Sequence, residues 1–380
     1  MTNSDITAAY YDVNPVSKIY LGSELVWPTT LPDPYLSMPL TFEILSAGTI
    51  SATTGMSLEY SINDGEWTTY ADAELNLQQG DILKLRGNNA TAPHFDGTAY
   101  FNAYGNAYSV LRATGFANIT ELTVTGACAY MFASFVGINI VSAENLKLPA
   151  TTLTDGCYEG MFQMCTALTT SPELPATTLA INCYGGMFAG CSSLTTAPVL
   201  PATTLAENCY SGMFNGCSSL TTAPALPATT LAYSCYGGMF NVCTSLTTAP
   251  ALPATTLSQS CYNNMFYGCT SLTTAPVLPA TTLAINCYGG MFQNCTSLTA
   301  APELPATTLV NDCYRSMFYK CNRLNYIKCL ATDISASDCT RYWVRNIAST
   351  GTFVKNPNMA GWTTGNNGIP TGWTVQDATI

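Results

Sequence analysis

The feature that most restricts the fold of this chain is a motif of 26 residues that is repeated seven times in succession. Between residues 148 and 321 the sequence keeps returning to LPATTL-xxx-CYxxMFxxC-xxLTTxPxL. One such unit cannot bury its apolar side alone, whereas a stack of units can, so the strict spacing predicts a solenoid of 26-residue coils. The two cysteine columns of the motif lie at Cys157, Cys183, Cys209, Cys235, Cys261, Cys287 and Cys313, and at Cys165, Cys191, Cys217, Cys243, Cys269, Cys295 and Cys321.

Degenerate copies extend the array at both ends. Residues 330–343 match the first half of the motif, since Cys339 follows Cys313 by 26 residues. Before the array, residues 129–132 (AYMF) followed by residues 146–153 (LKLPATTL) are interpreted as an opening copy. We therefore assign residues 126–345 to the solenoid.

The pattern within one copy suggests both helix and strand. In the copy that contains Cys183, the C, M, C and L positions are separated by four, four and three residues, which is the spacing of one face of a short helix. The LTTAP and PATTL segments are rich in Thr and bounded by Pro, which favours brief strands and turns. The predicted fold class is therefore an α+β repeat protein.

One segment of the motif carries a family resemblance. Residues Met187 to Pro198, MFAGCSSLTTAP, resemble the BspA-like family of leucine-rich repeats, and the likeness extends over about residues 130–345 in seven copies. The copies here are longer than the usual family unit, and they use Met and Pro where the family often has Ala and Ile. The resemblance implies a leucine-rich-repeat solenoid of the kind found in surface and adhesion proteins, without catalytic residues.

Charged residues are scarce, at 9% of the chain, and they sum to a net charge of −11. No Lys or Arg occurs between Lys147 and Arg315. This balance argues against binding to nucleic acid or to an anionic membrane, because both require clustered positive charge. The single histidine, His94, excludes most metal sites and most Ser/His or Cys/His catalysis. We therefore expect no enzyme activity, no cofactor and no metal ion.

The seventeen cysteines admit three interpretations. Buried, reduced thiols acting as small apolar side chains are favoured, because the number is odd and the spacing follows the repeat. Two cysteines eight residues apart on a helix would lie about 12 Å apart, beyond the reach of a disulfide. Disulfides between neighbouring coils and thiolate metal clusters are the alternatives. Reduced thiols would fit assembly in a reducing cytoplasm.

Other columns also recur in every copy. The Met and Phe of CYxxMF are assigned to the core. The Tyr is interpreted as part of a stacked, half-buried aromatic spine, with a sugar-stacking surface as the alternative. The paired threonines, such as Thr203 and Thr204, are interpreted as strand-forming ladders, with binding to a glycan or to ice as the alternative.

Some positions differ between copies: the three before CY, the two after it and the two after MF. Because a stacked core tolerates little variety, these positions are predicted to face solvent and to carry any specificity of recognition. The candidate binding residues are Glu207, Asn208, Tyr233, Ser234, Gln259, Ser260, Asn263, Asn264 and Tyr267.

The segments that flank the array differ from it in pattern. Residues 56–87 alternate apolar and polar side chains around NDG and QGD turn signals, so residues 36–125 are predicted to form a small antiparallel β-sandwich (Ig-like) domain that caps the first coil. Asp64-Gly65 predicts a hairpin turn, and His94 is expected to be an ordinary surface residue in a loop. Residues 346–380 are predicted to cap the last coil.

Residues 1–35 are predicted to form an N-terminal anchor or linker. The segment SKIYLGSELVWP (17–28) suggests two short strands about Gly22-Ser23. It resembles an element at the start of structural proteins, such as fibre and decoration proteins, from phages of gut Bacteroidales; an edge strand of the sandwich is the alternative. We expect no secretion signal, because the N-terminus lacks a basic and an apolar region, and no membrane insertion, because no run of about 18 apolar residues occurs.

Together these features predict a non-enzymatic, virion-associated binding protein of a bacteriophage, a head or tail fibre or decoration subunit that is assembled in the host cytoplasm. Its expected partners are virion structural proteins, through the N-terminus, and a host cell-surface glycan or protein. A secreted or surface-attached bacterial adhesin of the BspA-like type is the alternative. Whether the chain forms a homo-oligomer is left open, since no coiled-coil heptads indicate a trimer.

Overall fold

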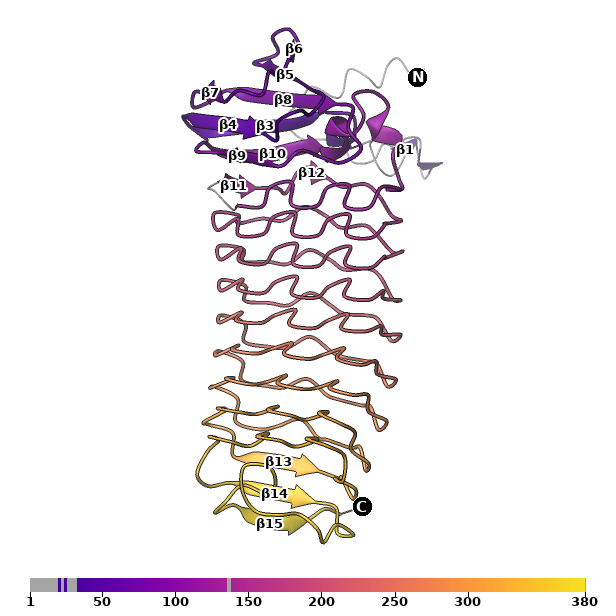
Figure 1. Cartoon of the computed structure of the whole chain (residues 1–380), viewed down its shortest axis with the longest axis vertical. Coiled ribbons are helices and arrows are strands. Elements are labelled where there is room, and N and C mark those ends of the chain that lie inside the picture. Colours follow the sequence, from indigo (N-terminus) through magenta and orange to yellow (C-terminus); the bar gives the residue numbers. More distant parts are fainter. Residues whose placement is uncertain (1–19, 22–23, 26–32, 135–137, 380) are drawn as a thin grey trace.

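The computed structural model of the chain describes residues 20–21, 24–25, 33–134 and 138–379, without the side chains of residues 20–25. The molecule is an elongated rod with a two-sheet domain at one end, a stack of coils along its length and a small parallel sheet at the other end (Figure 1). From residue 138 onward, each coil lies between the coil before it and the coil after it in sequence.

Two antiparallel sheets form the N-terminal domain. Their inward side chains share one core, in which the Phe42 ring lies 5.3 Å from the Phe95 ring of the other sheet. Short 3₁₀ helices lie beside the sheets: η2 (Pro34–Leu36), η3 (Ala107–Val110) and η4 (Phe116–Asn118). One sheet contains, in order, β10 (Tyr100–Asn106), β3 (Leu40–Ser46), β8 (Ile82–Gly87), β5 (Leu58–Ile62) and β6 (Thr68–Thr69), and the other contains β7 (Leu75–Leu77), β4 (Gly48–Ala52) and β9 (Phe95–Gly97).

The predicted hairpin is confirmed between β5 and β6, which pair antiparallel. Asn63 and Asp64 adopt positive φ angles of 52° and 59°, and the Gly65 N–H donates to the Ile62 carbonyl at 3.0 Å. Two left-handed residues in succession match the twist of the flanking strands, which is why this sequence is a strong hairpin signal. The turn is centred one residue earlier than the Asp64-Gly65 pair that the sequence suggested.

The N-terminal segment singled out in the sequence is described only in part. β1 (Tyr20–Leu21) and β2 (Glu24–Leu25) pair antiparallel, which confirms the two-strand pattern. Gly22 and Ser23, which connect the strands, lie outside the described residues, as does the rest of segment 17–28.

The larger sheet of the domain continues into the solenoid. β10 pairs in parallel with β11 (Asn139–Ser142) and with β12 (Leu146–Lys147). Further along the rod, parallel bridges join the threonine columns of successive coils, as Thr196 joins Thr222 and Thr204 joins Thr230. The paired threonines thus stack in columns from coil to coil, but they are joined by single backbone bridges and not by regular strands. The N-terminal domain supplies the first hydrogen-bonding edge on which coils stack.

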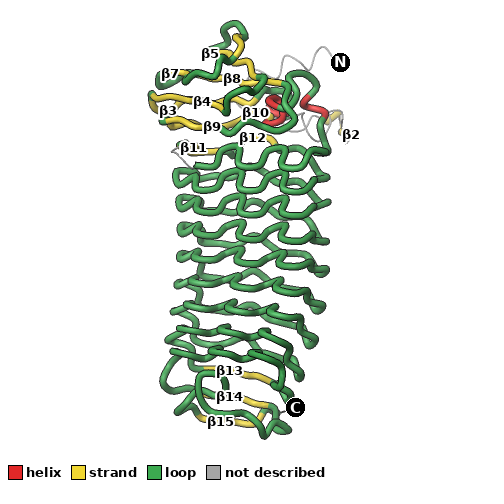
Figure 2. Tube along the Cα trace, in the orientation of Figure 1, coloured by secondary structure: helices red, strands yellow, loops and turns green. Residues whose placement is uncertain are grey.

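The prediction of a helix in every coil is wrong. The structure has no α-helix in any residue it describes, and the coils consist of turns and single bridges (Figure 2), so the fold class is not α+β. In the CYxxMFxxC segment two residues face inward and the next two face outward: residues 183–184 and 187–188 are buried, and residues 185–186 are partly exposed. Over so short a segment, this period of four is hard to distinguish from the spacing of a helix face, which explains the error.

Left-handed backbone geometry explains why these segments are not helical. Every fourth residue has a positive φ, as in Asn182 (54°), Gly186 (58°) and Gly190 (79°), and each such residue interrupts a right-handed helix. Glycine adopts this geometry freely, and Asn more readily than most residues. The three left-handed columns are Gly156, Asn182, Asn208, Ser234, Ser260, Asn286, Asp312 and Asp338; Gly160, Gly186, Gly212, Gly238, Asn264, Gly290, Ser316 and Tyr342; and Met164, Gly190, Gly216, Val242, Gly268, Asn294, Lys320 and Asn346.

Alternate N–H groups of these turn segments join the coils. The Tyr184 N–H donates to the Cys209 carbonyl of the next coil at 3.0 Å, and the Phe188 N–H donates to the Met213 carbonyl at 2.9 Å. The N–H groups between them close turns within the coil, as Met187 does by donating to the Tyr184 carbonyl at 3.2 Å. The backbone therefore satisfies its donors although it is neither a helix nor a regular strand.

Aromatic side chains stack inside the rod. The tyrosine rings from Tyr158 to Tyr314 follow one another at 5.5–6.2 Å, and the phenylalanine rings from Phe162 to Phe318 at 5.4–5.9 Å. The Met and Phe columns are core, as predicted. The tyrosines stack as predicted but are fully buried instead of half-buried, so they form no surface on which a sugar can stack.

Every cysteine is buried and none is bonded to another, as the favoured interpretation predicts. In the second column each thiol donates to a phenylalanine carbonyl of the preceding coil, as Cys217 Sγ does to Phe188 O at 3.1 Å. Burial raises the pKa of the Cys217 thiol to about 12, so it stays protonated and able to donate. This position suits a side chain that is small and apolar and that donates a weak hydrogen bond, and cysteine has both properties.

The C-terminal residues add two more rungs to the stack. β14 (Thr352–Lys355) pairs in parallel with β13 (Tyr326–Cys329), and β15 (Thr374–Asp377) pairs in parallel with β14. Trp362 stacks on the fully buried Trp343 with ring centroids 5.6 Å apart. These two indoles close the core at this end of the rod.

Replacing Val242 by Gly is expected to raise the free energy of unfolding by about 1 kcal/mol. Val242 has a φ of 57° in a column where three other coils have glycine, and it is 41% exposed, so its side chain contributes little packing. The left-handed conformation costs a residue with a Cβ roughly 1–2 kcal/mol, which exceeds the entropy that an added glycine loses on folding. Denaturation in urea measures the difference. Val277→Gly, at an exposed position without a positive φ, is the control and is expected to destabilise; a destabilised Val242→Gly would contradict the argument.

Candidate binding surface

The outward residues of the turn segments form one long face of the rod, here called the turn face. In one coil it comprises residues 207–208, 211–212 and 215–216, and the equivalents in other coils follow at intervals of 26 residues. All candidate residues predicted from the sequence lie on it, Glu207, Tyr233 and Gln259 exposed and the others half-buried. The half-buried candidates are Asn208, Ser234, Ser260, Asn263, Asn264 and Tyr267. A role of the nine candidate residues in binding stays a prediction.

A hollow of about 260 Å³ lies on the turn face toward the C-terminal end of the rod, and we call it the amide hollow. Gly289 and Gly290 line it and leave room for the neighbouring amide side chains. A Cβ on Gly289 would lie 2.0 Å from Asn286 Oδ1, and one on Gly290 would lie 2.1 Å from Asn264 Oδ1. The side chains that line the hollow are Asn263, Asn264, Asn286, Gln293, Arg315 and Ser316.

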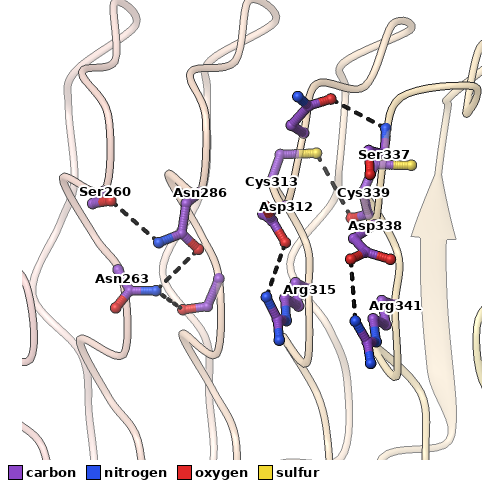
Figure 3. Close-up of polar contacts among 12 residues, drawn as sticks. Ser260, Asn263, Asn286, Asp312, Cys313, Arg315, Ser337, Asp338, Cys339 and Arg341 are labelled. Carbon is purple, nitrogen blue, oxygen red and sulfur yellow. Dashed lines mark hydrogen bonds and ion pairs between the residues drawn. The ribbon is translucent and has the colours of Figure 1, made fainter.

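The amides of this hollow are held by one another. Asn264 Nδ2 donates to Asn263 Oδ1 at 2.8 Å, and Asn263 Nδ2 donates to Asn286 Oδ1 at 3.1 Å and to the Gly289 carbonyl at 3.0 Å. Asn286 Nδ2 then donates to Ser260 Oγ at 3.1 Å (Figure 3). The structure thus brings together Ser260, Asn263 and Asn264, three of the predicted residues, and fixes their orientation. Asn264 Oδ1 receives no hydrogen bond within the described part of the chain, which leaves it open to a ligand.

Positive charge gathers beside the amide hollow in what we call the cationic patch: Arg315, Lys320, Arg341 and Arg345. Arg315 and Arg341 occupy equivalent positions in neighbouring coils and extend to the same side (Figure 3). Each is paired within its own coil, Arg315 to Asp312 at 3.3 Å and Arg341 to Asp338 at 3.2 Å. Both pairs join residues three apart, and both arginines keep nitrogen atoms beyond the one that forms the pair.

The other two cations of the patch lie against aromatic rings. Lys320 Nζ lies 5.3 Å from the Tyr319 ring centroid, and the Arg345 guanidinium lies 5.8 Å from the Tyr319 ring and 5.4 Å from the Tyr342 ring. Both side chains are exposed, and neither has a carboxylate within ion-pair distance among residues 33–134 and 138–379. We did not predict these residues. The sequence feature that could have indicated them is that Lys and Arg are absent between Lys147 and Arg315 and then occur several times from Arg315 onward.

A second hollow, of about 220 Å³, lies nearer the N-terminal end of the same face. It is likewise lined by a glycine pair, Gly185 and Gly186, but it is also lined by Glu159, whose carboxylate accepts a hydrogen bond from the Tyr130 hydroxyl at 3.0 Å. The turn face is therefore acidic near its N-terminal hollow and basic near its C-terminal hollow.

The single histidine lies at the junction between the two-sheet domain and the coils. His94 Nδ1 is 2.7 Å from the Tyr130 carbonyl, and Nε2 is 3.2 Å from Asp96 Oδ1. In the part of the chain that the structure covers, no group of three or more His, Cys, Asp or Glu residues has the arrangement of a metal site. Nor does that part contain a helix long and apolar enough to cross a membrane.

Comparison with known families identifies the repeat. The BspA type leucine rich repeat region matches the chain in six copies, over residues 133–247, 157–299 and 236–339. These matches together cover more than half of the 380 residues and include the amide hollow. No curated protein and no solved structure matches the chain.

Proposed function

Because the chain belongs to the BspA-type leucine-rich repeat family, a family of repeat proteins of the adhesin type, we propose that it is a non-enzymatic protein that binds a ligand along its turn face. The observation that carries the proposal is the contrast between the two sides of each turn segment. Inward positions repeat the same Cys, Tyr, Met and Phe in coil after coil, whereas the exposed column changes from Ile181 to Glu207, Tyr233 and Gln259. A variable surface on a constant core suits recognition of an extended ligand.

We further propose that the protein is a virion component of a bacteriophage, a head or tail fibre or decoration subunit that binds a host surface glycan or protein. Its N-terminus would contact virion structural proteins. Support comes from the likeness of residues 17–28 to the start of phage structural proteins, and from the reduced thiols, which suit assembly in a reducing cytoplasm. A bacterial surface adhesin is the second candidate, and membership of the BspA-type family favours it.

Location distinguishes the two candidates. An antibody against residues 36–125 is applied to purified phage particles and to host envelope fractions. The virion proposal predicts a fixed number of copies per particle, and it predicts that deletion of residues 1–30 abolishes incorporation. A signal confined to the envelope would make the protein an adhesin of the bacterium, and unchanged incorporation of the deletion variant would contradict the anchoring role.

Binding through the turn face has its own test on whole host cells. The double variant Ile181→Glu, Tyr233→Glu places two charges on exposed positions of this face, and we expect it to weaken cell binding about tenfold or more. Val199→Glu with Val277→Glu is the matched control, because both valines are 78% exposed and lie in the extended half of their coils. Fluorescence of labelled protein on cells measures binding, and equal loss in both variants would contradict a specific role of the turn face.

A further inference from the structure

We infer that the amide hollow and the cationic patch together bind an acidic polysaccharide, a chain of sugars that carry carboxylate groups. The inference rests on the proposed binding function and names the class of ligand for the C-terminal part of the turn face.

Charge is the first support for an anionic ligand. The chain carries a net charge of −11 and has no Lys or Arg between Lys147 and Arg315, so four cations on one face within residues 315–345 are a local concentration and not part of a basic surface. Lys320 and Arg345 have no carboxylate partner within the described ranges, and both are exposed. Guanidinium groups bind carboxylates through two parallel hydrogen bonds, which makes such a site selective for planar anions.

The tyrosines beside these cations suit a sugar ring. Tyr319 and Tyr342 lie under the charged ends of Lys320, Arg341 and Arg345 and limit the positions that these long side chains adopt. Tyr342 is 37% exposed, so part of its ring is open to solvent. An aromatic face packs against the C–H side of a sugar while neighbouring cations hold its carboxylate.

The amide hollow supplies the groups that recognise hydroxyls. Its network runs in one direction, from Asn264 through Asn263 and Asn286 to Ser260, and it leaves the Asn264 carbonyl oxygen as an acceptor at the surface. At about 260 Å³ the hollow is below the range of roughly 300–1,000 Å³ that is usual for pockets that enclose a whole ligand. It therefore suits one sugar of a chain that continues along the face to the cationic patch, because Arg315 borders both.

The same arrangement disfavours a nucleic acid. Phosphate backbones bind extended tracks of positive charge, whereas here the surface next to the cations is lined by neutral amides and the whole chain is acidic. A ligand that alternates carboxylates with hydroxyls contacts both the cationic patch and the amide hollow. A ligand that offers phosphates alone contacts only the cationic patch.

Titration calorimetry on the full chain at low salt tests the inference, with a hexamer of galacturonate as the probe. We expect binding that weakens with added salt, and no binding of maltohexaose, a neutral hexamer. The double variant Lys320→Gln, Arg345→Gln is expected to weaken binding about tenfold or more. Arg112→Gln is the control, because Arg112 is an exposed arginine of the N-terminal domain that also lacks a carboxylate partner among the described residues.

A second variant tests the hollow without risk to the fold. Asn264→Gly gives this position the residue that most other coils have at a left-handed φ, so the protein is expected to fold normally and to lose affinity for the hexuronate several-fold. Absence of hexuronate binding in the parent protein, or equal binding of a DNA hexanucleotide, would overturn the inference. If the parent protein failed to bind the hexuronate but still bound host cells, only the class of ligand would be wrong. If it bound neither the hexuronate nor host cells, the proposed binding function would be contradicted as well.

Discussion

Raising the pH from about 8 to about 10.5 is expected to unfold the rod in reducing buffer. Thiols of an unfolded chain ionise near pH 9, whereas burial raises the pKa of the folded thiols, to about 11 for Cys235 and to about 12 for Cys261 and Cys321. Because the pKa is higher in the folded state, the protonated buried thiol contributes its full stability below pH 9. This contribution is lost as the pH rises toward 11–12, since the unfolded chain then gives up its thiol protons more readily than the folded chain. Each ionising thiol lowers the free energy of unfolding by about 1.4 kcal/mol per pH unit in this window.

The number of thiols makes this effect decisive. Seventeen buried cysteines act together, so their sum within one to two pH units exceeds the roughly 5–15 kcal/mol that holds a typical domain folded. Circular dichroism and tryptophan fluorescence against pH measure the transition. Recovery of both signals on return to pH 8 with reductant separates the titration from chemical damage. A urea midpoint that stays constant between pH 8 and pH 10.5 would contradict the argument.

Substituting Phe240 by Ala is expected to lower the free energy of unfolding by about 3–5 kcal/mol. The Phe240 ring is fully buried in the middle of the rod and lies 5.7 Å from the rings of Phe214 and Phe266. Its removal leaves a cavity that neighbouring coils cannot fill, because their hydrogen bonds to one another hold the backbone spacing. Urea denaturation followed by circular dichroism measures the loss.

The same variant tests how strongly the coils are coupled. In a linear array each coil contacts only its neighbours, so a defect in the middle weakens the link between the two halves. We expect a broader unfolding transition in Phe240→Ala, with a smaller dependence on urea than in the parent. Val277→Ala is the control, since Val277 is 78% exposed and its truncation is expected to cost less than about 0.5 kcal/mol. Equal effects of the two substitutions would show that the aromatic stack does not carry the stability.

Local patterns predicted a large part of this fold. The 26-residue period predicted the stack of coils, and the invariant CYxxMF positions predicted the buried columns, because both follow from side-chain chemistry that recurs in the sequence. The alternation in residues 56–87 likewise predicted the strands of the N-terminal domain. The helix prediction failed although the signal was present. Asn or Gly recurs at every fourth position of the turn segment, as at Asn182, Gly186 and Gly190. Both are poor helix formers that adopt left-handed turns readily.

The candidate site was accessible to sequence reasoning only in part. Ser260, Asn263 and Asn264 are recognisable as outward residues because they vary between copies. Their hydrogen bonds to Asn286 depend on how one coil sits on the next, and that register follows from the turn geometry that the sequence analysis misjudged. The cationic patch likewise requires that Arg315 and Arg341 stack on one face, which holds because they are one repeat apart.

The direction of the hydrogen bonds between coils has a mechanical consequence. They run along the axis of the rod, so a pull between its two ends loads them directly, one coil at a time from a free end. Each coil that peels away releases 26 residues, about 90 Å of extended chain. We expect a rod of this design to lengthen in steps when it is pulled from its two ends, and to shorten again by restacking when the force falls.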